Sequence, residues 1–250
     1  MSYDGRHLWL ILKWCLFIML SYVLLGLMLR GERFLEWGLS KPGRIDYLFI
    51  LSFFLGALII FKTARRCFAR HFIKQRKVYL IIGWAIALGL TLQTLLSLCR
   101  GFVYWLTGSL IAVGSNQYVS VEHFSFIGER VVVFLLSPFA EELFFRYVTY
   151  TAFFWILNMI KEEFVAFRRV YDGSEEKKKK FIIVWGLVSS FLFALFHGVN
   201  VINVWFYLIP GIVYSFLFVK YGFLASWISH SVFNATSSSV RKAVVYLFGL

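Results

Sequence analysis

Long uninterrupted apolar runs are the feature that most restricts the fold of this 250-residue chain. Several approach the roughly 20 apolar residues that a helix needs to cross a hydrocarbon core of about 30 Å. Only helices and closed barrels satisfy their backbone in such a core, and these runs are too continuous for the alternating pattern of barrel strands. We therefore predict an all-α fold, a polytopic transmembrane helical bundle of about seven to eight spans. The predicted spans are Leu8–Leu29, Tyr47–Phe61, Val78–Cys99, Val131–Ile160, Phe181–Val199, Val201–Val219 and Phe223–Val240.

Composition supports this prediction, because 60% of the residues are hydrophobic and only 16% are charged. Soluble domains have about 45–50% apolar and about 25% charged residues, so this chain has too little polar surface for a water-soluble globule. No long polar linker divides it, which predicts one integral membrane domain. Within that domain, residues 1–130 supply N-terminal helices without a recognisable motif, and residues 131–240 supply the helices that carry the polar clusters described below.

The net charge of +13 is concentrated in loops that flank the spans. Residues 62–77 hold seven basic and no acidic side chains, and residues 161–180 hold a second, mixed cluster. Basic loops beside spans indicate the cytoplasmic side and suit anionic lipid headgroups, so no nucleic-acid partner is expected. We predict a multi-pass protein of the plasma membrane with a cytoplasmic N-terminus. Keeping both loops inside requires the short segment Phe102–Val113 to be re-entrant or interfacial.

A pair of adjacent carboxylates marks the first of three polar clusters in the later spans. Charged groups at a bilayer centre cost about 2.5–3.5 kcal/mol on insertion scales, so they are functional candidates by default. Glu142 and Arg146, at i and i+4, share a helix face and are predicted to pair. Glu141 lies about 100° around the helix and needs a partner from another helix, a water or a proton, which suits a general base. A purely structural pair would explain Glu142 and Arg146 but not Glu141.

Two further clusters follow on separate spans. Phe193 and His197 share a helix face, so the aromatic ring is expected to pack beneath the imidazole. His230 and Asn234 also lie at i and i+4, and both side chains can donate hydrogen bonds to an oxyanion that grows on a carbonyl. Each pattern alone is equally typical of hydrogen-bonded packing between helices. Three such clusters on three successive spans favour a functional site.

In combination, Glu-Glu-x-x-x-Arg, Phe-x-x-x-His and His-x-x-x-Asn resemble the CAAX protease and bacteriocin-processing (CPBP, or Abi) family, which includes the Rce1-type endopeptidases. All three motifs are intact, and the resemblance covers about residues 131–236. It implies an intramembrane glutamic endopeptidase in which Glu141 activates water and His197 orients it. It further implies that His230 and Asn234 form the oxyanion site. Glu142, Arg146 and Phe193 would support these residues.

The expected substrate is a membrane-associated protein or peptide, with or without a lipid group. CAAX-type C-termini, leader peptides and sorting tails all fit the family. No cofactor is expected, although two histidines and a glutamate on three helices could also hold a catalytic zinc ion. A non-catalytic immunity or partner-binding membrane protein is the alternative from another class. A proton-coupled transporter is the third hypothesis, because buried carboxylates and histidines also form proton relays.

Overall fold

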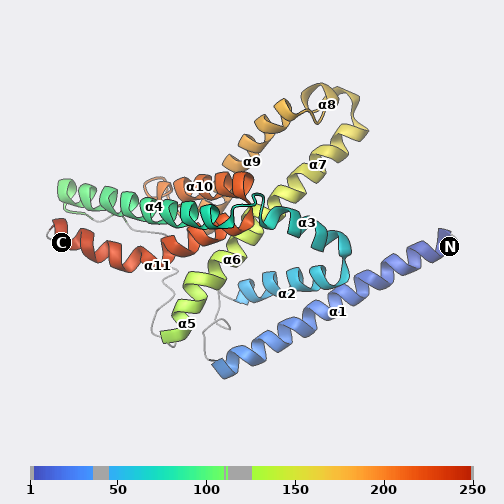
Figure 1. Ribbon diagram of the computed structural model, residues 1–250, viewed down its shortest axis with the longest axis horizontal. Coiled ribbons are helices and arrows are strands. Elements are labelled where there is room, and N and C mark those ends of the chain that lie inside the picture. The colour runs from blue at the N-terminus through green and yellow to red at the C-terminus, as the bar shows by residue number, and fades with distance from the viewer. Residues whose placement is uncertain (1–2, 36–44, 110, 112–125, 249–250) are drawn as a thin grey trace. The chain divides into compact units, whose positions relative to one another are not determined.

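The structure is a computed structural model that describes residues 3–35, 45–109, 111 and 126–248. Every regular element within these ranges is a helix, which confirms the all-α prediction (Figure 1). The chain divides into two compact units. One consists of Met1–Phe72 with Val119–Ala140, and the other of Ile73–Tyr118 with Glu141–Leu250.

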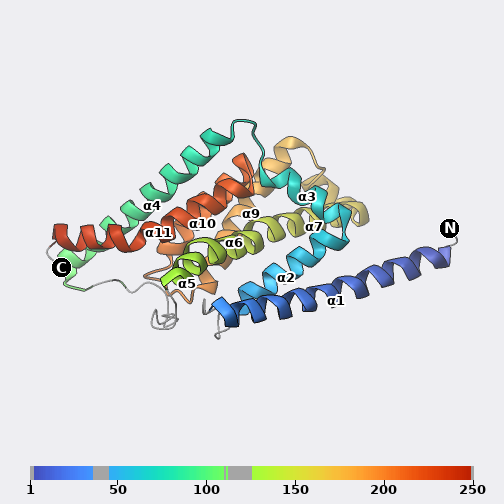
Figure 2. The same ribbon diagram turned by 60° about the horizontal axis from the view of Figure 1, so that its bottom comes forward.

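The first unit is built around a helical hairpin. Helix α1 (Tyr3–Leu35) packs along α2 (Ile45–Ile60), as Figure 2 shows. Helix α3 (Lys62–Phe72) then turns away from α2 by 113°. The guanidinium of Arg65 stabilises this bend, because it donates to carbonyl oxygens of the last turn of α2 at 2.7 Å.

A second stretch of chain completes this unit. It comprises α5 (Phe126–Val131), the π-helical segment η2 (Val132–Leu136) and the start of α6 (Ser137–Glu142). Leu25, Leu48 and Val132 form the small buried core of the first unit.

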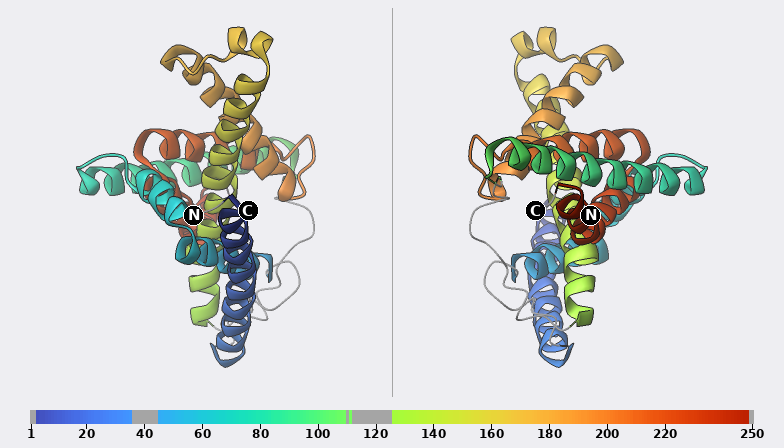
Figure 3. Two further views of the ribbon diagram at one scale, coloured as in Figure 1. Left: turned by 90° about the vertical axis from the view of Figure 1, so that its right-hand side faces the viewer. Right: turned by 90° about the vertical axis from the view of Figure 1, so that its left-hand side faces the viewer.

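The second unit contains the remaining helices and all three polar clusters. Its elements are α4 (Val78–Thr107), the π-helical segment η3 (Leu143–Val148), α7 (Thr149–Glu163), α8 (Val165–Val170), α9 (Glu175–Phe196), α10 (Trp205–Tyr221) and α11 (Phe223–Phe248). Helices α7 and α9 form a hairpin with α8 at its tip (Figure 3). Helix α4 packs along α11, and α10 contacts both α9 and α11.

Lys74 anchors the loop before α4 to the end of α10. Its backbone N–H donates to Tyr221 O and its ammonium to Val219 O, each at 3.0 Å, so two carbonyls at the helix end gain partners. The ammonium also lies 5.0 Å from the centre of the Phe218 ring. Burial, with a smaller contribution from the charge of Lys178, lowers the pKa of Lys74 to about 8.

Several helix boundaries differ from the predicted ones, among them those of α4, α9 and α11. Residues Phe102–Thr107 continue α4, which ends at Gly108 in the left-handed conformation (φ 67°). The predicted separate segment Phe102–Val113 is therefore wrong for these residues, while residues 110, 112 and 113 lie outside the described part of the chain. Helix α9 takes up the charged run before Phe181 as its first turns, and α11 continues beyond Val240 to Phe248.

Length and composition allow four described helical stretches to cross a membrane, and five if the bent pair α2–α3 is one broken span. The four are Leu8–Glu32, Val78–Thr107, Val132–Glu163 and Glu175–Phe196. Large apolar side chains on three of them point outwards, with Trp9, Trp84 and Trp155 each at least half exposed, as lipid contact requires. The chain is an integral membrane protein. The larger count of seven to eight spans stays a prediction.

Candidate active site

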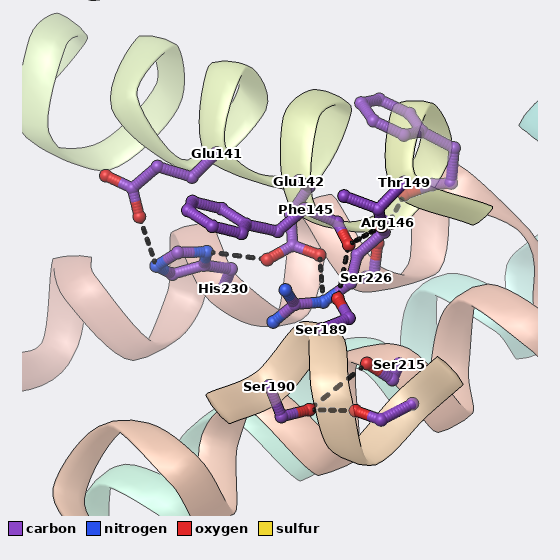
Figure 4. Close-up of polar contacts among 12 residues, drawn as sticks. Glu141, Glu142, Phe145, Arg146, Thr149, Ser189, Ser190, Ser215, Ser226 and His230 are labelled. Carbon is purple, nitrogen blue, oxygen red and sulfur yellow. Dashed lines mark hydrogen bonds and ion pairs between the residues drawn. The ribbon is translucent and has the colours of Figure 1, made fainter. Parts of the chain in front are cut away.

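The predicted Glu142–Arg146 pair is present and fully buried. Arg146 Nε lies 3.4 Å from Glu142 Oε2, and both side chains have 0% exposure (Figure 4). The guanidinium also lies over the face of Phe193, 4.9 Å from the ring centre. Burial of two opposite charges removes both from water, and their contact offsets part of that cost.

A π-helical turn and two hydroxyl groups hold this pair in place. Arg146 belongs to η3, and π turns inside α-helices are frequent at functional sites. The Phe145 carbonyl accepts hydrogen bonds from the Thr149 hydroxyl, at 2.6 Å, and from the Ser189 hydroxyl of α9. Trp185 Nε1 of α9 donates to the same Thr149 hydroxyl at 3.1 Å. These bonds fix the rotation of the helix that carries the carboxylates relative to α9.

His230 connects the two carboxylates. Its Nδ1 lies 3.0 Å from Glu142 Oε1 and its Nε2 lies 3.7 Å from Glu141 Oε2, as Figure 4 shows. Glu142 therefore bridges Arg146 and His230, a link that the sequence did not predict. If Glu142 is ionised it can only accept, so the Nδ1 of His230 carries a proton and donates it to this bond.

His197 approaches Glu141 from α9. The helix ends at this residue because Gly198 follows in the left-handed conformation (φ 62°). His197 Nδ1 lies 2.8 Å from the backbone carbonyl of Phe193, which can only accept, so Nδ1 is the protonated nitrogen. In the neutral ring, Nε2 then carries the lone pair, and this atom lies 3.8 Å from Glu141 Oε2.

Glu141 is thus the point where the two imidazoles meet. Separations of 3.7 and 3.8 Å are too long for direct hydrogen bonds and suit a water that bridges the groups. The site is open on the His197 side, since that side chain is 27% exposed while His230 is 6% exposed. Among the described residues, no group of three His, Cys, Asp or Glu side chains is arranged to hold a metal ion.

A comparison with protein-family models found one match that covers this site. The model for type II CAAX prenyl endopeptidase Rce1-like proteins matches residues 123–236. These residues belong to the Rce1-like family. The match contains all three polar clusters, and the family is named for enzymes that hydrolyse peptide bonds. No curated protein and no solved structure matches the chain.

Asn234, the remaining predicted site residue, belongs to the Rce1-like segment as well. It lies on α11 one turn after His230 and is half-buried. Its backbone carbonyl accepts a hydrogen bond from the Ser237 hydroxyl at 2.9 Å. This position keeps Asn234 on the same helix face as His230, as the i,i+4 spacing predicted.

The Rce1-like segment also contains two aromatic residues beside the site that the sequence reasoning missed. Tyr207 stacks on His197 with ring centres 4.3 Å apart, and Tyr214 stacks on His230 at 4.7 Å. Both come from α10, which carries none of the predicted residues. Their spacing of seven, two turns of one helix, was the signal available in the sequence. Phe193, which was predicted, contacts both imidazoles, at 4.6 and 5.7 Å.

Proposed function

We propose that this chain is an intramembrane endopeptidase that hydrolyses a peptide bond of a membrane-associated protein or peptide. The observation that carries the proposal is the approach of two imidazole Nε2 atoms to one carboxylate oxygen. Nε2 of His197 lies 3.8 Å and Nε2 of His230 3.7 Å from Oε2 of Glu141. This set supplies a base, a second water acceptor and a donor for an oxyanion.

In the proposed reaction, Glu141 removes a proton from a water molecule while the water oxygen attacks the peptide carbonyl carbon. The lone pair on His197 Nε2 accepts the second O–H of this water and orients it. The carbonyl π electrons move to oxygen and form the tetrahedral oxyanion. When the C–N bond breaks, the proton held by Glu141 passes to the leaving nitrogen, so the products are a carboxylic acid and an amine.

The pairing of His230 with Glu142 refines the proposed oxyanion site. Since Nδ1 donates to Glu142, a neutral His230 has only a lone pair on Nε2 and cannot stabilise an oxyanion from there. A donor role at Nε2 requires the doubly protonated imidazolium form of His230. Two carboxylates, one guanidinium and one imidazolium then sum to zero charge, which a buried site favours. The amide of Asn234 can donate without a change of protonation.

For the substrate, the family favours a C-terminal CAAX-type peptide that carries a prenyl group, with leader peptides and sorting tails as alternatives. The proposed orientation, in the plasma membrane with a cytoplasmic N-terminus, places α3 at the inner surface. Lys62, Arg66 and Arg70 of this helix are exposed, while Phe68 packs on Phe54 at 4.8 Å. A basic helix with one apolar face suits contact with anionic lipid headgroups.

A membrane proteomic comparison of wild type with Glu141→Gln tests the proposal. Uncleaved precursors should accumulate in the variant. The proteins that are cut in wild type and remain uncut in the variant are the substrates. Identical precursor levels, with function retained in Glu141→Gln, would favour a scaffold in which the polar set only holds helices together. Proton-coupled uptake by vesicles that contain the protein would instead identify a transporter.

A further inference from the structure

Each imidazole of the site lies flat against a tyrosine from α10. The Tyr207 and His197 rings are inclined by 29° with centres 4.3 Å apart, and the Tyr214 and His230 rings by 17° with centres 4.7 Å apart. Seven residues make nearly two turns of an α-helix, so the two tyrosines project from one face of α10. One helix thus contacts both histidines, which come from α9 and α11.

We propose that Tyr207 and Tyr214 are positioning residues that set the planes of the two imidazoles, so that both Nε2 atoms face Glu141. This inference rests on the proposed function for its catalytic consequence. A hydrogen bond at Nδ1 fixes one edge of each ring but still permits the ring to tilt about that bond. A second ring stacked on its face removes this freedom, and offset stacking is a favoured geometry for such pairs.

Phe193 contacts both imidazoles as well. Its ring is inclined by 55° to His197, at 4.6 Å, and by 82° to His230, at 5.7 Å. Each histidine is therefore held by a hydrogen bond at Nδ1, by the Phe193 ring and by a tyrosine face. In each ring, Nε2 is then the nitrogen that can interact with water or substrate.

Close packing of α10 against α9 fixes where the two tyrosines lie along α9. Gly211, midway between Tyr207 and Tyr214, has no room for a side chain, since a Cβ there would lie 2.9 Å from Ser190 Cβ. The connection from His197 to α10 is also tight. The Asn200 side-chain oxygen accepts from the Asn203 N–H at 3.0 Å, and the Asn203 side-chain oxygen accepts from the Asn200 N–H at 2.7 Å.

For Tyr214 the aromatic ring, not the hydroxyl, carries the proposed role. The side chain is fully buried, and within the described part of the chain its hydroxyl has no hydrogen-bond partner. Tyr214→Phe keeps the stacked ring and removes a buried polar group, so it should be at least as stable as wild type. Tyr214→Leu removes the flat face and leaves an apolar side chain.

The test compares Tyr214→Leu and Tyr214→Phe with the matched control Phe218→Leu. Phe218 is equally buried on α10 and packs on Tyr150 and Trp185, away from both imidazoles. A catalytic group displaced by about 1 Å can cost about 100-fold in rate, so Tyr214→Leu should lower kcat by about 10- to 100-fold with little change in KM. Tyr214→Phe and Phe218→Leu should retain kcat near wild type, although Phe218→Leu loses thermal stability.

A second measurement reads the ring positions without any substrate. The chain has five histidines, so ring-labelled histidine gives a simple NMR spectrum that His197→Ala and His230→Ala assign. Stacking on tyrosine shifts imidazole protons upfield. Tyr214→Leu should shift the His230 signals downfield and spare those of His197, and Tyr207→Leu, at a half-buried position, should do the reverse.

Unchanged His230 signals and unchanged kcat in Tyr214→Leu would overturn the inference. So would a Tyr214→Phe variant as impaired as Tyr214→Leu, since the hydroxyl would then be the active part. If the NMR shifts follow the prediction while the wild-type protein cleaves nothing, the stacking of the tyrosines on the imidazoles stands and the proposed function fails.

Discussion

Removing either partner of the buried Glu142–Arg146 pair should destabilise the protein, and the loss of stability should depend on which partner is removed. Both side chains have 0% exposure, and removal of one partner from a buried pair typically costs about 3–5 kcal/mol. Arg146→Met leaves Glu142 with His230 Nδ1 at 3.0 Å, so its cost should fall near the lower limit. Glu142→Met leaves the guanidinium without its contacting carboxylate, next to the faces of Phe193 and Tyr214, which places its cost near the upper limit.

The double variant distinguishes the interaction between Glu142 and Arg146 from the contacts that each of them makes with other groups. Glu142→Met with Arg146→Met removes both charges, and apolar replacement of a whole buried pair is often close to neutral. Its loss should therefore be smaller than that of either single variant, far below the sum of the two.

Thermal unfolding in detergent, followed by tryptophan fluorescence, measures these effects. At about 2–4 °C per kcal/mol, the single variants should melt about 6–20 °C below wild type. Glu141→Gln is the matched control and should melt near wild type, because this more exposed carboxylate is not part of the pair. Additive losses, or an Arg146→Met variant as stable as Glu141→Gln, would refute the reasoning.

Three further predictions concern the oxyanion site, the metal and pH. Asn234→Ala should lower kcat by about 10²–10³-fold with little change in KM or thermal stability, and a fully active variant that melts early would assign Asn234 to helix packing. The purified enzyme should contain substoichiometric zinc and stay active after prolonged chelation, whereas stoichiometric zinc lost together with activity would establish a His–His–Glu metal site. The pKa of Lys74 is lowered from 10.5 to about 8, so between these pH values the unfolded chain binds more protons and stability should rise with pH. Melting temperatures at pH about 8 and about 10 should show this rise in wild type and a smaller one in Lys74→Met.

Local spacing was sufficient to predict part of the site. The i,i+4 rule anticipated the Glu142–Arg146 pair, and the shared face of Phe193 and His197 anticipated their contact. The Glu142–His230 bond joins residues 88 positions apart, and no periodicity within one helix encodes such a contact. It depends on how η3 and α11 are rotated when they pack.

The apolar, aromatic-rich composition made other features hard to recognise in the sequence. Aromatic residues make up 20% of the chain, so Tyr207 and Tyr214 looked like ordinary packing residues of an apolar span. The predicted span ended at Cys99, but the guanidinium of the next residue, Arg100, donates to Ile111 O at 2.8 Å and lies over the ring of Phe206, so α4 continues.

The end of α11 was misplaced for a similar reason. The predicted span ended at Val240, before Arg241 and Lys242, but α11 continues through both residues, whose side chains are exposed. Beyond them, Val244 and Phe248 approach Gly101 of α4 closely, and this contact stabilises the additional turns.

The most direct test of the account is the activity of purified Glu141→Gln beside wild type on a quenched fluorescent peptide that ends in a prenylated CAAX sequence. Loss of a general base typically costs about 10²–10⁴-fold, so kcat should fall by at least this factor while the melting temperature stays near that of wild type. The carboxylate, not its shape, is then the active part, because glutamine keeps the volume and the polarity. A folded Glu141→Gln enzyme that cleaves the peptide at the wild-type rate would contradict the proposed mechanism.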